Sequence, residues 1–149
     1  MAAPDVLREF FSDVLDLPHD ASEWLLSLWH TTQFLDDVAD GDKIDRSDFN
    51  YALNKLLVEM PASQFFSQNA PQLLMSVAVF IAKWQASDFL ERLDKADQRT
   101  FMWRAGYYDV ILTVVILCHG LHTATKMAPD IMSLYGESYE SYKEEFPNG

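Results

Sequence analysis

Apolar residues recur along this chain at helical spacing, and proline, glycine and aspartate divide them into segments. The pattern predicts helices over residues 4–16, 20–39, 48–60, 69–93 and 98–125, with a short last helix after Pro129. We find no alternating pattern typical of a strand. The expected fold is therefore an all-α bundle of about five to six helices. We expect a single domain over residues 1–149 and an acidic tail, open to fraying, over about 136–149.

Polar residues stand where several of these helices should begin or end. Asp20 with Glu23 forms the pattern of a capping box, and Ser47 and Asp97 are suitable caps for later helices. Gly41 follows the second helix, where a glycine commonly ends a helix. These residues set the boundaries that the pattern predicts.

Composition narrows the function classes. The net charge of -12, with eleven basic residues scattered along 149, argues against binding to nucleic acid or to an anionic membrane. The lone cysteine, Cys118, lies in an apolar run, so we interpret it as a core residue. A single cysteine forms no disulfide within the chain, which fits a reducing compartment. The N-terminus lacks the pattern of a signal peptide, and no run approaches the roughly 18 apolar residues of a membrane span. We expect a cytoplasmic protein that does not enter a membrane.

The most informative segment ends the second predicted helix, where four aspartates fall within seven residues. At helical spacing, one arc of about 120° holds a set of polar side chains while leucines cover other sides. The set comprises His30, Gln33, Asp36, Asp37 and Asp40. A helix that is apolar nearly all round is usually buried, so this polar stripe is interpreted as facing an internal cleft.

Electrostatics suggests a ligand for this cluster. A helix C-terminus already carries partial negative charge, and neighbouring aspartates add repulsion. A hard cation liganded by carboxylate oxygens would offset both, with Mg²⁺ the first candidate and Ca²⁺ the second. Asp42 and Arg46 follow closely, and together with His30 and Gln33 they are candidates to support the metal ligands or to bind a ligand. The alternative is that Asp-Gly-Asp is a solvated connection between two helices.

The motif Asp36-Asp-Val-Ala-Asp40 resembles the first aspartate-rich motif, Asp-Asp-x-x-Asp, of the isoprenoid (terpenoid) synthase superfamily. The resemblance implies an all-α bundle in which Asp36, Asp37 and Asp40 hold Mg²⁺ ions that bind a diphosphate small molecule. Chain-elongating members place Arg-Arg-Gly after the motif, and of these residues only Arg46 has a counterpart here. The segment also looks like that of small uncharacterised phage-borne helical proteins, a resemblance that implies no activity.

A second copy of the aspartate-rich motif is absent from the chain. Asp88, Glu91 and Asp94 form the best available second acidic cluster, and we interpret them as a solvated helix face. A different metal hypothesis takes residues 37–48 as a twelve-residue calcium loop, with Asp37 first and Asp48 last. That loop lacks two interior ligands and its glycine, so it would bind Ca²⁺ weakly.

The longest predicted helix, over residues 98–125, carries one acidic residue inside an apolar pattern. Asp109 there needs a partner, because an unpaired buried carboxylate is costly. We expect Arg104, Tyr108 or the metal cluster to supply it. Asp109 is therefore a candidate second wall of the site, and the alternative is a structural ion pair or a surface position near the start of the helix.

Two functions remain open. In the first, the chain is a non-enzymatic interaction or accessory protein whose acidic surface meets a protein partner, with an apolar face open to a second copy of the chain. In the second, it is a Mg²⁺-dependent, terpenoid-synthase-like protein that binds or acts on a diphosphate small molecule. The first predicts exposed, diverging aspartates and an apolar patch elsewhere; the second predicts a concave pocket at the end of helix 20–39.

Overall fold

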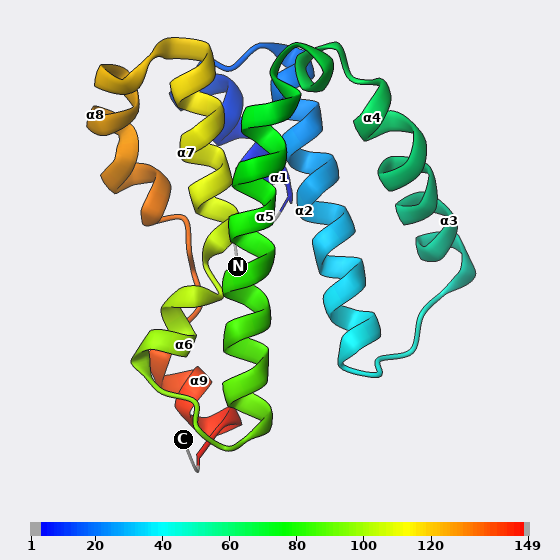
Figure 1. Cartoon of the computed structure of the whole chain (residues 1–149), viewed down its shortest axis with the longest axis vertical. Coiled ribbons are helices and arrows are strands. Elements are labelled where there is room, and N and C mark those ends of the chain that lie inside the picture. Colours follow the sequence, from blue (N-terminus) through cyan, green and yellow to red (C-terminus); the bar gives the residue numbers. More distant parts are fainter. Residues whose placement is uncertain (1–3, 148–149) are drawn as a thin grey trace. The chain divides into compact units, whose positions relative to one another are not determined.

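The computed structural model describes residues 4–147, and Figure 1 shows helices joined by short turns. Residues 4–147 contain no strand, which confirms the all-α prediction. They divide into more helical segments than the five or six that we expected. These are α1 (Pro4–Glu9), η1 (Phe10–Val14), α2 (His19–Ala39), α3 (Arg46–Asn54), η2 (Lys55–Glu59), α4 (Met60–Ala62), α5 (Gln64–Arg92), α6 (Gln98–Trp103), α7 (Gly106–His119), α8 (Leu121–Met132) and α9 (Tyr139–Glu145), where η denotes a π-helical turn.

The chain forms two compact units, with the boundary between Ala70 and Pro71. We call Pro4–Ala70 the N-terminal unit and the described residues from Pro71 onward the C-terminal unit. The boundary coincides with a kink in α5, where Asn69 leaves helical geometry (φ -130°, ψ 20°) and its side-chain amide donates to the Phe65 carbonyl at 3.0 Å. Pro71 has no N–H to continue the ladder there. The single-domain expectation stays a prediction.

The N-terminal unit is organised around α2. Leu7 of α1, Phe11 of η1 and Leu25 of α2 are all fully buried. The segment from α3 to α4 runs back along α2 (Figure 1). Two ring contacts join α2 and α3, His30 with Tyr51 at 5.5 Å and Phe34 with Phe49 at 6.0 Å. Aromatic packing therefore holds α3 against α2.

Two of the predicted caps in this unit are each wrong by two residues. The cap position of α2 is Pro18, so Asp20 lies in the first turn and accepts a hydrogen bond from the Ala21 N–H at 3.0 Å. Glu23 forms an ion pair with Arg8. Asp45, not Ser47, precedes α3, and its side chain makes no capping bond. Pro18 explains why α2 begins earlier than expected, because proline fixes φ at a value that suits the start of a helix.

In the C-terminal unit, one narrow stripe of α5 is buried. Leu73, Phe80 and Ser87 repeat every seven residues and are buried. Phe80 contacts Tyr107 at a ring distance of 6.4 Å. Gly106 permits this approach, because a Cβ there would lie 2.8 Å from the Phe80 ring and 3.2 Å from the Phe80 Cα. The glycine is needed for close packing of the two helices.

The single helix predicted over residues 98–125 is broken twice. Asp97 caps α6 as predicted, in a full capping box with Thr100. The chain turns after Trp103 and again at Gly120, whose φ of 88° a helix does not adopt. Pro129, expected to mark a break, lies inside α8. The apolar pattern is continuous across these points, so periodicity does not reveal the breaks.

The acidic tail contains α9, which packs against α6. Tyr142 of α9 is buried and belongs to a small core with Ala96 and Phe101. Tyr135, Tyr139 and Phe146 pack around that core. Aromatic side chains thus attach this acidic segment to the C-terminal unit.

Candidate functional site

The aspartate-rich segment ends α2 in a hydrogen-bonded helix stop. Gly41 adopts a φ of 75°, its N–H donates to the Val38 carbonyl at 3.2 Å, and the Asp42 N–H donates to the Asp37 carbonyl at 3.0 Å. This pair of bonds is the Schellman arrangement, which satisfies carbonyls that a helix end leaves free. The prediction that Gly41 stops this helix is confirmed, and local backbone geometry accounts for the Asp-Gly-Asp sequence.

The carboxylates themselves point into solvent more than into a cleft. Asp37, Asp40 and Asp42 are exposed, and Asp36 is half-buried. Among residues 4–147, no group of three or more His, Cys, Asp or Glu side chains is placed to hold a metal ion. The assignment of Asp36, Asp37 and Asp40 as Mg²⁺ ligands stays a prediction.

His30 and Gln33, the candidates one or two turns earlier on α2, are both half-buried. The His30 ring lies 5.1 Å from that of Trp29 and 5.5 Å from that of Tyr51. Burial, followed by the charges of Lys55 and Arg8, lowers the pKa of His30. The structure therefore gives His30 a neutral packing role between α2 and α3.

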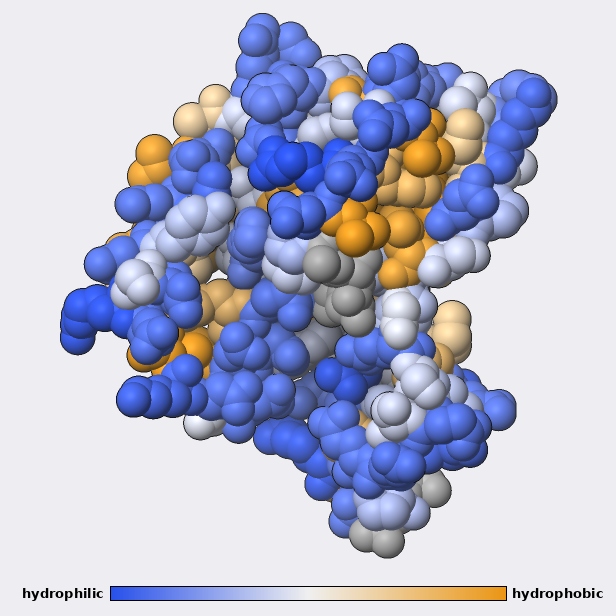
Figure 2. All heavy atoms as spheres, turned by 180° about the vertical axis from the view of Figure 1, so that it is seen from behind, coloured by the Kyte–Doolittle hydropathy of each residue, from blue (hydrophilic) through white to orange (hydrophobic). Residues whose placement is uncertain are grey.

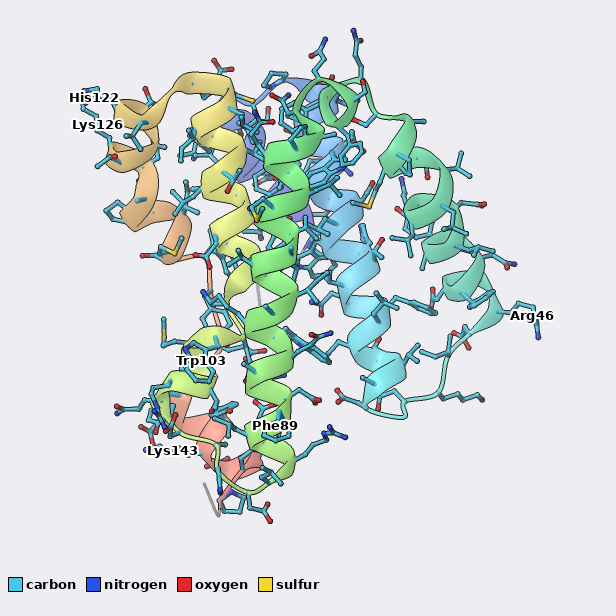
Figure 3. The ribbon with its side chains drawn as sticks, viewed as in Figure 1. Arg46, Phe89, Trp103, His122, Lys126 and Lys143 are labelled. Carbon is cyan, nitrogen blue, oxygen red and sulfur yellow. The ribbon has the colours of Figure 1, made fainter. Side chains whose placement is uncertain are left out.

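Arg46 begins α3, and its side chain extends outward from the helix (Figure 3). With Ile44, Asp45 and Phe49 it lines a shallow hollow of about 330 Å³. The hollow belongs to the turn before α3. It places Asp45 and Arg46 next to the first exposed aromatic residue of that helix.

Asp109 belongs to the C-terminal unit, on α7. Its carboxylate pairs with Lys83 of α5 at 2.6 Å, and its side chain is 39% exposed. The expected partners were Arg104, Tyr108 or the metal cluster, and Lys83 was not among them. Lys83 lies one helical turn beyond Phe80, so the ion pair belongs to the packing of α5 on α7.

Large hydrophobic residues are exposed along α3 and η2. Phe49, Leu53, Leu56 and Leu57 are exposed by 44%, 42%, 43% and 64%. Their spacing, i, i+4, i+7 and i+8, places them along one helix face. We call these four residues the α3–η2 surface. Phe49 also contacts Phe34 of α2, so the face is exposed only in part, and the sequence predicts the helix but not this exposure.

A second exposed apolar surface lies on α5. Of the described residues, α5 is the one helix long and apolar enough to cross a membrane by length and composition, which corrects our expectation that no segment reaches that standard. Within its most apolar 18-residue stretch, 17% is buried. Leu74, Met75 and Phe89 are exposed by 57%, 68% and 57%. Figure 2 views the molecule from behind, where hydrophobic side chains reach the surface among hydrophilic ones, and the exposed side of α5 is not on the face it shows.

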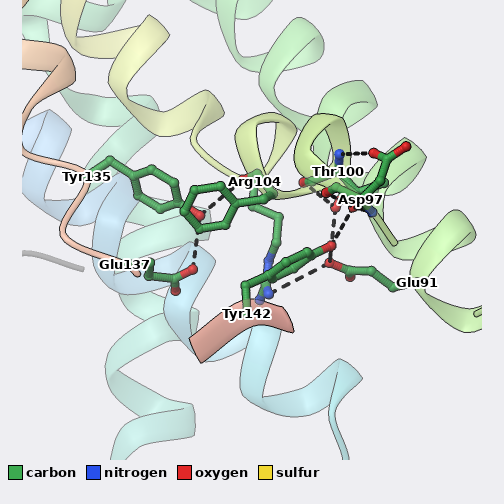
Figure 4. A network of polar contacts seen from close by, with 9 residues as sticks. Glu91, Asp97, Thr100, Arg104, Tyr135, Glu137 and Tyr142 are labelled. Carbon is green, nitrogen blue, oxygen red and sulfur yellow. Dashed lines mark hydrogen bonds and ion pairs between the residues drawn. The ribbon is translucent and has the colours of Figure 1, made fainter. Parts of the chain in front are cut away.

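Glu91 is the centre of a polar network that sequence reasoning placed on a solvated face (Figure 4). Its side chain is 10% exposed and lies 3.7 Å from Arg104. Tyr142 donates to the Glu91 carboxylate at 2.7 Å, and the Tyr142 hydroxyl also contacts Thr100 at 2.5 Å. The network therefore connects α5, α6 and α9. The interpretation of Glu91 as part of a solvated cluster is wrong.

The environment of Glu91 shifts its titration. Burial raises the pKa of Glu91, while the hydrogen bond from Tyr142 and the charge of Arg104 partly oppose that rise. Burial and the neighbouring Glu91 raise the pKa of Tyr142 to about 12. Nearby Asp94 ends α5 with a φ of 56°, and the Lys95 N–H donates to the Leu90 carbonyl at 2.8 Å. These contacts stabilise a junction of helices, and they leave the carboxylate enclosed by protein groups.

Comparison of the chain with protein-family models, with curated proteins and with solved structures gives no match. The resemblance to terpenoid synthases therefore rests on the aspartate motif.

Proposed function

We propose that this protein is a non-enzymatic helical interaction protein, and that its α3–η2 surface binds a basic amphipathic helix of a partner protein. The observation that carries the proposal is the exposure of Phe49, Leu53, Leu56 and Leu57 along one helix face. Exposed apolar side chains that lie together are typical of interaction sites. Asp37, Asp40 and Asp42, which precede this face, are exposed as well, and exposed aspartates are what an interaction role predicts.

The shape of the surface favours a helical partner. The four side chains extend along about 12 Å of helix, given an axial rise of about 1.5 Å per residue. A second helix can lie along such a stripe and insert its own residues at i, i+3, i+4 and i+7. The hollow beside Phe49 offers space for one larger side chain at the end of the stripe.

The charge around the surface favours a basic partner. Residues 36–59 hold seven acidic and three basic side chains, and the whole chain carries a net charge of -12. Asp45 shares the hollow with Phe49, so negative charge meets the apolar stripe at one end. Lysine or arginine on the partner would speed encounter and fix its direction along the stripe. A second copy of this surface would instead meet like charge.

The experiment is a fluorescence anisotropy titration with a labelled amphipathic helix of 18 leucine and lysine residues, a length of about five helical turns. The control peptide has the same composition in an order that forms no apolar face. We expect the L53Q/L57Q variant, which keeps the charge of the protein, to bind the amphipathic peptide at least about tenfold more weakly. Leu74→Gln, at an exposed leucine of α5, is the matched control and should bind normally. Equal binding of both peptides, or no effect of L53Q/L57Q, would contradict the proposal.

One observation favours the competing function, a Mg²⁺-dependent protein of the terpenoid-synthase type. Asp36, Asp37 and Asp40 lie together at the C-terminal end of α2. Calorimetric titration with Mg²⁺, Mn²⁺ and Ca²⁺, with and without pyrophosphate, tests it in the wild type and in D36N/D37N. Saturable binding that pyrophosphate strengthens and the variant loses would favour that function. We expect no such binding, because no three ligands among residues 4–147 are placed to share one ion.

A further inference from the structure

We propose that the exposed face of α5 binds a second copy of this chain and forms a weak dimer. We define the α5 face by eight residues that lie opposite the buried stripe of this helix. They are Leu74, Met75, Ala78, Val79, Ile81, Ala82, Gln85 and Phe89, and all eight are exposed. This inference concerns the C-terminal unit and is independent of the function proposed for the α3–η2 surface.

The spacing of the α5 face suits helix-to-helix packing. Met75, Ala78, Ala82, Gln85 and Phe89 follow one another at intervals of three and four residues. That interval is the one at which side chains of two helices interlock in a coiled coil. Ala78 and Ala82 in the middle permit close approach of two backbones, while larger side chains stand at the ends. A helix of the same kind fits this profile.

The absence of charge on the α5 face favours a second copy of the chain over an acidic or basic partner. The α5 face contains no charged residue. The two charged residues beside it are paired within the unit, Lys83 with Asp109 at 2.6 Å and Asp88 with Arg92 at 3.4 Å. A charged partner would therefore find no complement here. Two copies of an uncharged face meet without local repulsion, and a twofold arrangement applies the same face twice.

The size of the face implies a weak interaction. Residues 74–89 extend for about 22 Å along the helix, which gives an interface smaller than the roughly 800 Å² per partner of standard complexes. Each copy also carries a net charge of -12, which opposes association at long range. We therefore expect reversible dimerisation in the range of about 10 to 100 µM, strengthened by salt.

Sedimentation velocity over about 1 to 300 µM tests the inference on the full chain. The weight-average mass should rise from that of one 17.1 kDa chain towards twice that value as concentration increases. Ala82→Glu, at the centre of the face, should weaken the dimer at least about tenfold, because the new charge would be buried in the interface. Thr125→Glu adds the same charge at an exposed position of α8 and should leave dimerisation unchanged. Circular dichroism checks that both variants remain helical.

Cysteine cross-linking provides a second readout. In a Cys118→Ser background, Ala82→Cys should form a disulfide between two chains under mild oxidation, whereas Gln98→Cys on α6 should not. A monomer at every concentration, or a dimer that Ala82→Glu does not weaken, would overturn the inference. Binding to neutral phosphatidylcholine vesicles without dimerisation in buffer would also overturn it, since the face would then contact lipid.

Discussion

The α3–η2 surface and the α5 face are both exposed and apolar, yet they differ in charge. Acidic residues precede and flank the α3–η2 surface, and Asp45 shares a hollow with Phe49. The α5 face has no charged residue among its eight positions. The comparison teaches that the charge around an apolar surface, rather than its hydrophobicity, indicates the kind of partner that fits it. We infer a basic helix for the first surface and a second copy for the other.

The two surfaces also differ in the support beneath them. The α5 face lies opposite a buried stripe of Leu73, Phe80 and Ser87. Gly106 lets α7 pack closely against Phe80 of that stripe. Within α3 and η2, by contrast, Ala52 alone is buried. A segment with so few buried contacts adjusts easily. The α3–η2 surface is thus suited to a partner that imposes its own shape, and the α5 face to a fixed geometry.

The largest expected effect comes from removing the support of the α5 face. Gly106→Ala would place a Cβ 2.8 Å from the Phe80 ring and 3.2 Å from the Phe80 Cα, so one helix must shift. We expect a loss of about 1–3 kcal/mol in the free energy of unfolding of the C-terminal unit. Denaturant titration measures it, and dimerisation should weaken while peptide binding is kept. An unchanged midpoint would show that α5 and α7 are not closely packed at Gly106.

The second largest expected effect is a different salt dependence of binding at the two surfaces. Raising NaCl from about 0.05 to 0.5 M shortens the screening length from more than 10 Å to a few ångströms. Binding of the basic peptide should weaken several-fold, because attraction to the acidic residues is screened. The dimer should strengthen by a smaller factor, because repulsion between two chains of charge -12 is screened. Anisotropy and sedimentation at the same salt concentrations measure the two affinities. If both affinities change in the same direction, the two surfaces do not differ in charge as described.

The smallest expected effect concerns Glu91 of the C-terminal unit, whose side chain is 10% exposed. Burial raises its pKa above the ordinary value of 4.5, so the folded state retains the proton to higher pH than the unfolded chain. The contribution of this group to stability is therefore present below pH 4.5 and is lost as pH rises through the raised pKa. Relative to Glu91→Gln, the wild type should lose stability over that interval.

Thermal unfolding at a series of pH values measures this difference. Glu144→Gln removes an exposed carboxylate of α9 and serves as the control, for which we expect no comparable change. If Glu91→Gln and Glu144→Gln follow the same pH dependence, then Glu91 is not enclosed as described.

Much of the fold could be predicted from local sequence signals. The end of α2 at Gly41 and the start of α6 at Asp97 follow from backbone and capping chemistry within a few residues. The breaks at Trp103 and Gly120 interrupt a continuous apolar pattern, so periodicity alone predicts one helix. Tertiary packing decides such points, as it does where Phe80 contacts Gly106.

The candidate sites were harder to predict. The aspartates of α2 form an obvious pattern, whose placement is explained by a helix stop. Glu91 looked like a solvated residue, because its partner Tyr142 lies 51 positions away in the sequence. Leu53 and Leu57 look like core residues of an amphipathic helix, and the sequence does not show which apolar face will be left uncovered. Long-range contacts supply the missing information.

The most direct test of the central claim is a ¹H–¹⁵N NMR titration of the full chain with the amphipathic leucine–lysine peptide. The account predicts that shift changes concentrate in residues 45–58, and that they vanish in the L53Q/L57Q variant. Residues 74–89 should keep their positions at protein concentrations below the dimer range. Changes spread over the acidic residues of the whole chain, or centred on another segment, would contradict the claim that the α3–η2 surface is the binding site.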